Sequence, residues 1–137
     1  MSSYYKLFAD ILTYDVDIPE EIANCKIPKI TLQPLVENAL YHGIKNKRGK
    51  GRIVVTGRRE KDKCVIRVED NGIGMTKERL NQVRGGLTTK IEDSNDFYGL
   101  YNVNERIRLK FGEEYGLSID SVLQEGTCVE VWLPWES

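Results

Sequence analysis

Five segments of the chain have the length and residue pattern of β-strands. The first alternates apolar with polar residues from Leu12 to Ile18 and ends before Pro19, which is typical of a half-buried strand. Only four residues separate the second segment from the third, so we expect these two strands to pair antiparallel. The strands are expected at 12–18, 53–59, 64–70, about 117–122 and about 127–133.

Two longer segments repeat their apolar residues at the spacing of an α-helix. One begins at Thr31 and tolerates Pro34, because this residue falls in the first turn. The other begins at Gly99 and keeps its basic residues outside. A brief helix is expected from Thr76, whose hydroxyl can cap it, to about Arg84. The buried faces of the two longer helices are expected to comprise Leu32, Leu35, Val36, Ala39, Leu40, Leu100, Val103, Ile107 and Phe111.

Together these elements predict a mixed, mostly antiparallel sheet with helices on one face. This is an α+β fold, a two-layer α/β sandwich. At 137 residues and 40% apolar content, the chain is the size of a single domain with one core. Residues 85–98 show neither the apolar spacing of a helix nor the alternation of a strand. Their Gly, Thr, Ser, Asn and Asp content predicts a mobile loop long enough to act as a lid.

Charge and cysteine content exclude several classes of function. The net charge of −1, with mixed signs, gives no general attraction to nucleic acid or membrane. The basic residues within 45–52 lack interleaved aromatics and predict a solvated loop, with a bias of the nearby cleft toward phosphate as the alternative. No apolar run approaches a membrane span and no signal-peptide core is visible, so we expect a cytoplasmic domain. Three scattered cysteines predict reduced thiols, and with one histidine a zinc site is not expected.

The stretch from Asp70 to Met75 follows a predicted strand and allows two interpretations. Asn71-Gly72 after a strand is a common hairpin signal. Alternatively, a carboxylate followed by glycines at 72 and 74 could grip a flat polar ligand, because glycine permits positive φ and a close approach of the backbone. The residues that follow do not resume a strand pattern. The stretch is therefore expected to join a strand to a helix.

Asn38 and His42 are four residues apart and stack along the edge of a predicted helix's buried face. An amide and an imidazole at such an edge are placed to line a cleft. A helix-surface amide and a solvated histidine are the alternatives that these residues alone leave open.

Four stretches together resemble the Bergerat-type ATP-binding fold shared by sensor histidine kinases, gyrase-type topoisomerases, the Hsp90 chaperones and the MutL mismatch-repair proteins. They occur in the order and at the intervals of that family. The stretches are Leu32 to Ala39, Asp70 to Met75, Gly99 to Ile107 and Glu125 to Thr127. The resemblance implies an ATP-binding catalytic domain over residues 12–137 and leaves residues 1–11 as an N-terminal remnant or an added start.

The resemblance implies a role for each residue that matches the family's motifs. Asp70 would accept a hydrogen bond from the adenine amino group, and Thr127 would join it through its hydroxyl and a water. Asn38 would give its amide oxygen to Mg²⁺, and the helix N-terminus at Gly99 would meet the phosphates. Residues 85–98 would be the ATP lid. The implied ATP-binding residues are Asn38, His42, Asp70, Gly72, Gly74, Met75, Gly99, Leu100 and Thr127, with Asn38 as the metal ligand.

Pro34 indicates the subfamily. Hydrolysing members, and the related anti-sigma serine kinases, carry a glutamate four residues before the metal-binding asparagine, where it can act as a general base. Proline accepts no proton, so neither water nor a serine hydroxyl would be activated there. The stretch around Pro34 is similar instead to the histidine kinases of two-component systems, in the branch of the LytS- and YesM-like sensors. His42 lies on the nucleotide-binding helix, so we expect the phosphoacceptor histidine, and thus the catalytic nucleophile, to lie outside this chain.

The resemblance therefore implies a histidine protein kinase catalytic domain that uses Mg-ATP and shows little activity in isolation. Its expected partners are the acceptor-histidine dimerisation domain of the same protein and a downstream response regulator, but no nucleic acid. The full-length protein is expected to be a membrane-bound homodimer with this domain on the cytoplasmic side.

Two residues depart from the family pattern. Tyr41 stands where many sensor kinases have a lysine near the phosphates, and Phe97 stands where the lid motif often has its first glycine. Two alternative functions stay open: an anti-sigma-type serine kinase, against which Pro34 argues, and a nucleotide-binding regulatory module without phosphotransfer.

Overall fold

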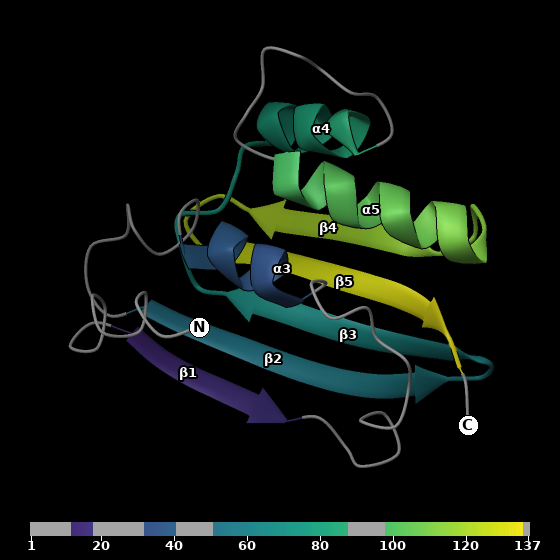
Figure 1. The fold of residues 1–137 in the computed structure, drawn as a ribbon. Helices are drawn as coiled ribbons and strands as arrows, with labels where there is room; N and C mark the ends of the chain where they lie inside the picture. The colour runs from purple at the N-terminus through teal and green to yellow at the C-terminus, as the bar shows by residue number, and fades with distance from the viewer. Residues whose placement is uncertain (1–11, 18–31, 41–50, 88–97, 136–137) are drawn as a thin grey trace.

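A five-stranded mixed sheet forms one layer of the molecule (Figure 1). The computed structural model describes residues 12–17, 32–40, 51–87 and 98–135. The strands are ordered β1-β2-β3-β5-β4; β1 pairs parallel with β2, and the other three pairings are antiparallel. They are β1 (Leu12–Asp17), β2 (Gly51–Glu60), β3 (Lys63–Asp70), β4 (Gly116–Val122) and β5 (Gly126–Pro134). The predicted α+β fold with a mixed, mostly antiparallel sheet is confirmed.

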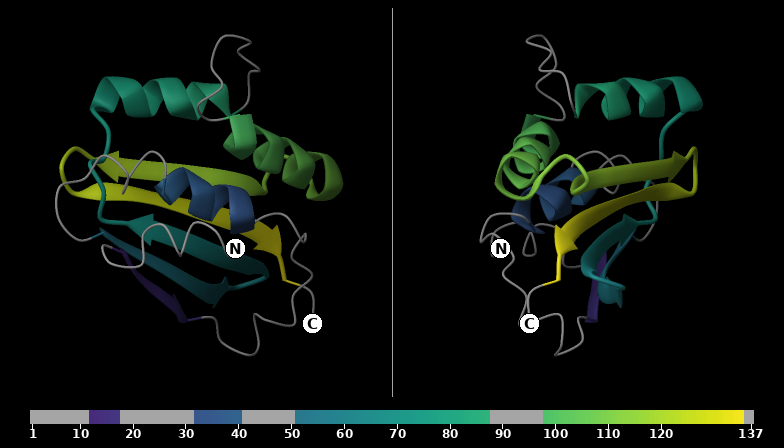
Figure 2. Two further views of the ribbon diagram at one scale, coloured as in Figure 1. Left: turned by 60° about the vertical axis from the view of Figure 1, so that its left-hand side comes forward. Right: turned by 90° about the vertical axis from the view of Figure 1, so that its right-hand side faces the viewer.

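Helices form the second layer, on one face of this sheet (Figure 2). They are α3 (Leu32–Asn38), α4 (Lys77–Gly86) and α5 (Tyr98–Phe111). Figure 1 shows α3 in front of the central strands and α5 in front of β4, whereas α4 lies above α5 at the β4 side of the sheet. Leu80 and Val83 of α4 belong to the same apolar core as the other two helices. None of the described helices is long and apolar enough to cross a bilayer.

The core lies between the two layers and follows the predicted alternation. On β3 and β5, every second residue faces the helices and is buried. From the helices, the predicted faces are buried as well, apart from Phe111, which is partly buried, and Leu32, whose side chain lies outside the described residues. The buried core residues of these elements are Leu35, Val36, Ala39, Leu40, Cys64, Ile66, Val68, Leu100, Val103, Ile107, Val129, Val131 and Leu133.

The largest difference from the sequence prediction lies in the expected lid. The helix α4 runs on through Gly85 and Gly86 and is capped at Leu87, instead of ending at Arg84. Glycine costs a helix only modest conformational entropy, and the packing of α4 on the core overrides that cost. The helix α5 begins at Tyr98. Residues 88–97 of the predicted lid lie outside the described residues, as do Ile18, Tyr41, His42 and Phe97.

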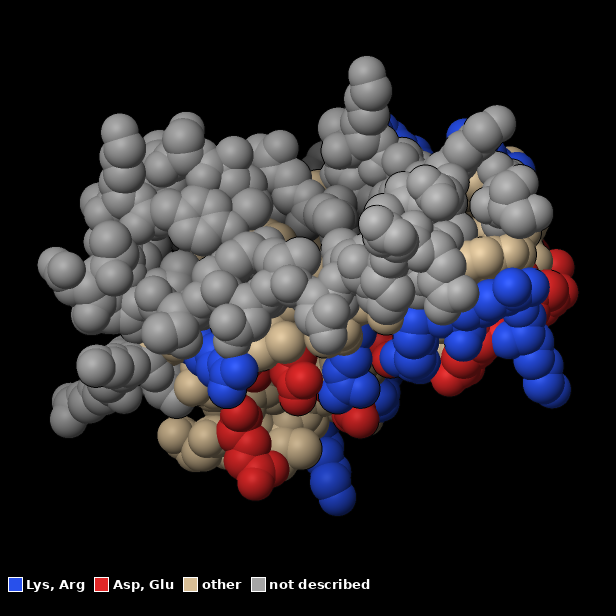
Figure 3. Space-filling view, turned by 90° about the horizontal axis from the view of Figure 1, so that it is seen from below, with Lys and Arg blue, Asp and Glu red and all other residues tan. Residues whose placement is uncertain are grey.

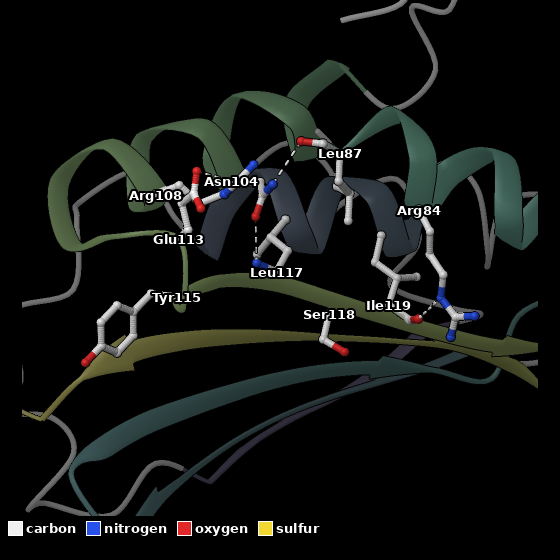
Figure 4. Close-up of a pocket in the computed structure, with 9 residues that line it drawn as sticks. All are labelled: Arg84, Leu87, Asn104, Arg108, Glu113, Tyr115, Leu117, Ser118 and Ile119. Carbon is white, nitrogen blue, oxygen red and sulfur yellow. Dashed lines mark hydrogen bonds and ion pairs between the residues drawn. The ribbon is translucent and has the colours of Figure 1, made fainter. Parts of the chain in front are cut away.

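Side chains from both neighbouring helices close the outer edge of β4 (Figure 4). Asn104 of α5 donates to the carbonyl oxygen of Leu87 over 2.9 Å and accepts from the Leu117 N–H over 2.9 Å. Arg84 Nε donates to the carbonyl oxygen of Ile119 over 3.0 Å. These bonds satisfy backbone groups that an unpaired edge strand would otherwise offer to another chain. They also fix the end of α4 to the sheet.

The opposite face of the sheet carries paired charges (Figure 3). Glu130 of β5 accepts from Arg58 over 3.0 Å and lies 3.8 Å from Arg67. The guanidinium of Arg58 also stands 5.7 Å from the ring centroid of Trp132. Figure 3 shows acidic and basic side chains interleaved along this side, without a large patch of one sign.

Candidate functional site

A buried carboxylate lies at the carboxyl end of the central strand β3. Asp70 is 5% exposed, and its Cα pairs with Ile53 on β2 and with Thr127 on β5. The side chain lies on the helix-covered face, as the alternation of β3 predicts. The Gly72 N–H donates to Asp70 Oδ1 over 2.8 Å and orients the carboxylate. A carboxylate held in this way is a directed acceptor for a polar ligand.

The loop after Asp70 joins β3 to α4, so the hairpin interpretation of Asn71-Gly72 is wrong. Asn71 pairs with Arg52 of β2 through both its backbone and its side chain. Its N–H donates to the Arg52 carbonyl oxygen over 3.2 Å, and its Oδ1 accepts from the Arg52 N–H over 2.7 Å. Thr76 then caps α4 as predicted, with Oγ1 accepting from the Arg79 N–H over 3.1 Å. The loop is thus anchored at both ends.

The two glycines of this loop serve the chain's own packing. Gly74 has a φ of +68°, whereas Gly72 is not among the residues with positive φ. A Cβ at position 74 would collide with the carbonyl oxygen of Val122, the last residue of β4. In the same contact, the Gln124 N–H donates to the Ile73 carbonyl oxygen over 2.6 Å. The expected positive φ is therefore confirmed at Gly74 and not found at Gly72, whose N–H holds Asp70. The approach of a ligand to these glycines stays a prediction.

Thr127 lies beside Asp70 at the start of β5 and is 6% exposed. The preceding residue, Gly126, has a φ of +131°, and a Cβ there would collide with the carbonyl oxygen of Asp70. Thr127 Oγ1 also lies 2.8 Å from the hydroxyl oxygen of Ser121 on β4. The sequence reasoning missed Ser121, because counting residues across the expected turn at 124–126 would place Leu123 opposite Thr127, whereas the structure pairs Val122 with Gly126 and Ser121 with Thr127.

Asn38, at the end of α3, has a buried side-chain oxygen. The residue is 8% exposed, so it lies deeper than the predicted edge of the helix. Its Oδ1 accepts no hydrogen bond from any described residue. A buried polar atom without a partner needs an explanation, and a hard cation that prefers oxygen ligands is one that fits an amide oxygen. His42 lies outside the described residues, so its predicted role stays a prediction.

The start of α5 lies next to α3. A Cβ added to Gly99 would stand 3.6 Å from the Pro34 Cβ, and Gly99 itself is exposed. Leu100 is 2% exposed and belongs to the core, so its predicted ligand contact would have to come from its backbone. Met75 is partly buried against the same core. The N-terminus of this 14-residue helix presents its positive dipole end to an anion.

The described residues contain no thiolate nucleophile. Burial raises the pKa of the Cys128 thiol to about 11, so this thiol is protonated at neutral pH, and Cys64 is fully buried in the core. Within the described ranges, no cluster of three or more His, Cys, Asp or Glu could hold a metal ion. A cation at Asn38 would therefore share its coordination with a ligand that brings its own oxygens. The described residues are therefore suited to binding and positioning a ligand.

Comparisons with known proteins agree with this geometry. Residues 28–137 match the family described as "Histidine kinase-, DNA gyrase B-, and HSP90-like ATPase". The chain is 38% identical over 128 residues to the sensor histidine kinase YesM of Bacillus subtilis and 32% identical over 130 residues to the sensor protein LytS of Staphylococcus saprophyticus. These alignments cover 93% and 95% of this chain, but only 20% and 22% of the two relatives. The chain thus spans about a fifth of their length.

A solved structure shows the same fold. The chain superposes on the catalytic domain of the histidine kinase ThkA with a TM-score of 0.67. The match covers 96% of this chain and 89% of that one, at 14% sequence identity. The arrangement of sheet and helices is therefore that of a histidine kinase catalytic domain.

We predict that Gly126→Ala destabilises the protein by at least about 2 kcal/mol, because it combines positive φ with a collision against the Asp70 backbone. Urea unfolding followed by circular dichroism measures this change. Gly85→Ala is the matched control: it has open space around the added methyl and lies in a helix, so stability should hold or rise by about 0.5 kcal/mol. Equal effects of the two substitutions would contradict the role of Gly126.

Proposed function

The chain belongs to the family of histidine kinase-, DNA gyrase B- and HSP90-like ATPases, and we propose that it binds Mg-ATP and passes the γ-phosphoryl group to a histidine supplied by another domain. The observation that carries this proposal is the buried Asp70 carboxylate, which the Gly72 N–H orients and which lies next to the Thr127 hydroxyl. Catalysis in this chain rests on positioning and electrostatics, and no catalytic nucleophile comes from it.

In this proposal, the end of β3 binds the adenine base. Asp70 accepts a hydrogen bond from the 6-amino group of adenine, and Thr127 contributes its hydroxyl directly or through a water. A guanine base would turn a carbonyl oxygen toward the same carboxylate, and two acceptors cannot share a hydrogen bond. Gly72, Gly74 and Met75 complete this end of the pocket through the loop that anchors Asp70.

The phosphates are assigned to the N-terminus of α5 and to Asn38. The backbone N–H groups of Gly99 and Leu100 lie in the first turn of α5, where the helix dipole favours negative charge. The buried Oδ1 of Asn38 has no hydrogen-bond partner among the described residues and fits a ligand of Mg²⁺. His42 is proposed as a further ligand contact of the nucleotide. When bound, the cation neutralises phosphate charge. The chain's own contribution is to hold the triphosphate in one orientation, with its terminal group directed to the incoming nucleophile.

The position of Pro34 supports phosphotransfer to a histidine. Pro34 lies in α3 one turn before Asn38 and cannot activate a water or a serine hydroxyl. An imidazole needs no such activation, because its nitrogen carries a lone pair. It forms the new N–P bond as the bridging P–O bond breaks, and ADP leaves with the bonding electrons. The names of the relatives, which are sensor histidine kinases, point the same way.

The remaining parts of the proposed system follow from those relatives. We propose that residues 12–137 act as the catalytic domain beside an acceptor-histidine dimerisation domain of the same protein, and that a response regulator receives the phosphoryl group. The relatives are named as sensor proteins, which supports a role in signalling. We further propose that the full-length protein is a membrane-bound homodimer with this domain on the cytoplasmic side.

We predict that Asp70→Asn lowers ATP affinity by more than about tenfold, because one acceptor oxygen and the negative charge are lost. The fold should persist, since asparagine has nearly the same shape and keeps an oxygen for the Gly72 N–H. Isothermal titration calorimetry measures the affinity. Asp120→Asn is the matched control, because that side chain is 78% exposed on β4, and its affinity should equal the wild type. Wild-type affinity in Asp70→Asn would remove the adenine role from this carboxylate.

For Asn38→Ala we predict that Mg²⁺ no longer strengthens ATP binding, because the amide oxygen that would join the cation is gone. The measurement compares ATP affinity with Mg²⁺ and with excess chelator in each protein. Asn81→Ala on the exposed side of α4 serves as the control and should keep the full Mg²⁺ effect. An Asn38→Ala protein that responds to Mg²⁺ as strongly as the wild type would refute the metal role.

A further inference from the structure

Three oxygen atoms form a hydrogen-bonded row at the end of the β4–β5 hairpin. Thr127 Oγ1 lies 2.8 Å from Ser121 Oγ, and Ser121 Oγ donates to the carbonyl oxygen of Gly126 over 2.9 Å. The Cα of Thr127 pairs with Ser121 on one side and with Asp70 on the other. The row therefore ends next to the strand position that carries the buried carboxylate.

The number of hydroxyl protons fixes the direction of both bonds. A backbone carbonyl can only accept, so the single proton of Ser121 lies toward Gly126. The contact between the two hydroxyls then uses the proton of Thr127, which points to Ser121. Thr127 Oγ1 is left with lone pairs only. Toward any further partner, it is an acceptor.

The backbone around the row makes this direction hard to reverse. Gly126 is confined by its contact with the Asp70 carbonyl oxygen and has a φ of +131°. Thr127 is β-branched and 6% exposed, so χ1 has few alternatives and Oγ1 is held beside Ser121. Turning the Ser121 proton toward Thr127 would also remove the hydrogen bond to the Gly126 carbonyl oxygen.

We propose that Ser121 is a positioning residue for the nucleobase: by holding the Thr127 proton, it makes Thr127 a pure acceptor that favours a 6-aminopurine over a 6-oxopurine. The inference rests on the proposed ATP-binding function. An amino group has two N–H protons, one for Asp70 and one for Thr127. A water between the base and the strands would donate to both residues and so accept from the amino group. A 6-oxo group meets only acceptors in either arrangement.

The experiment measures the dissociation constants of inosine triphosphate and ATP, both with Mg²⁺, by calorimetry on the whole chain. The ratio compared between variants is the constant for inosine triphosphate divided by the constant for ATP. In Ser121→Ala the Thr127 proton is free to turn toward a 6-oxo group. The ratio of the two constants should therefore fall about three- to tenfold. It should return to the wild-type value in Ser121→Thr, which keeps the hydroxyl. Ser118→Ala is the matched control, because it is exposed on the same strand and should leave the ratio unchanged.

A second variant tests the same claim without changing Ser121. Thr127→Val removes the acceptor at nearly constant shape and should lower the ratio at least as far. In that background, Ser121→Ala should cause no further change, which a double-mutant cycle measures.

The outcomes separate the inference from the function on which it rests. A wild-type protein that binds neither nucleotide overturns both. A wild-type protein that prefers ATP, with a ratio that Ser121→Ala and Thr127→Val leave unchanged, overturns the inference alone. A fall in the ratio that Ser121→Thr does not reverse, or that Ser118→Ala shares, also overturns it.

Discussion

The rest of the site depends on the close approach of Gly126 to the backbone of Asp70. Glycine alone fits there, because the residue has positive φ and no room for a Cβ. This contact fixes the register in which β5 joins β3, and a slip by one residue would turn every side chain to the other face. With the register fixed, Asp70 and Thr127 lie side by side on the helix-covered face. The β4–β5 turn then reaches the loop after Asp70 and seats Gly74 against Val122.

Burial determines how strongly the two polar groups of the proposed pocket, the Asp70 carboxylate and the Asn38 amide oxygen, can interact with a ligand. A carboxylate removed from water costs free energy unless hydrogen bonds compensate it, and the Gly72 N–H supplies one at Asp70. The oxygen of Asn38 is buried without a partner among the described residues. A buried group interacts with a ligand more strongly than the same group would at the surface, because the low local dielectric strengthens each electrostatic interaction. We propose that the end of the central strand β3 and the start of α5 together provide a preorganised surface for a nucleotide.

Local patterns of the sequence predicted much of this arrangement. Alternation placed Asp70 on the buried face, and the repeat from Leu100 to Ile107 gave the face of α5 correctly. Features that depend on contacts between separate segments of the chain were not predicted. Asn104 closes the β4 edge, Ser121 meets Thr127 across a hairpin, and β1 pairs parallel with β2. The extension of α4 through Gly86 was missed because tertiary packing overrides the weak helix propensity of glycine.

The central claim has two halves. Asp70 selects an adenine nucleotide, and the γ-phosphoryl group passes to a histidine outside this chain, because Pro34 cannot act as a general base. Its first half can be measured directly on the unmodified chain by titrating it with ATP and with GTP in the presence of Mg²⁺. The account predicts one binding site per chain for ATP and an affinity for GTP that is lower by at least about tenfold. Equal affinities for the two nucleotides, or no binding of ATP, would contradict it.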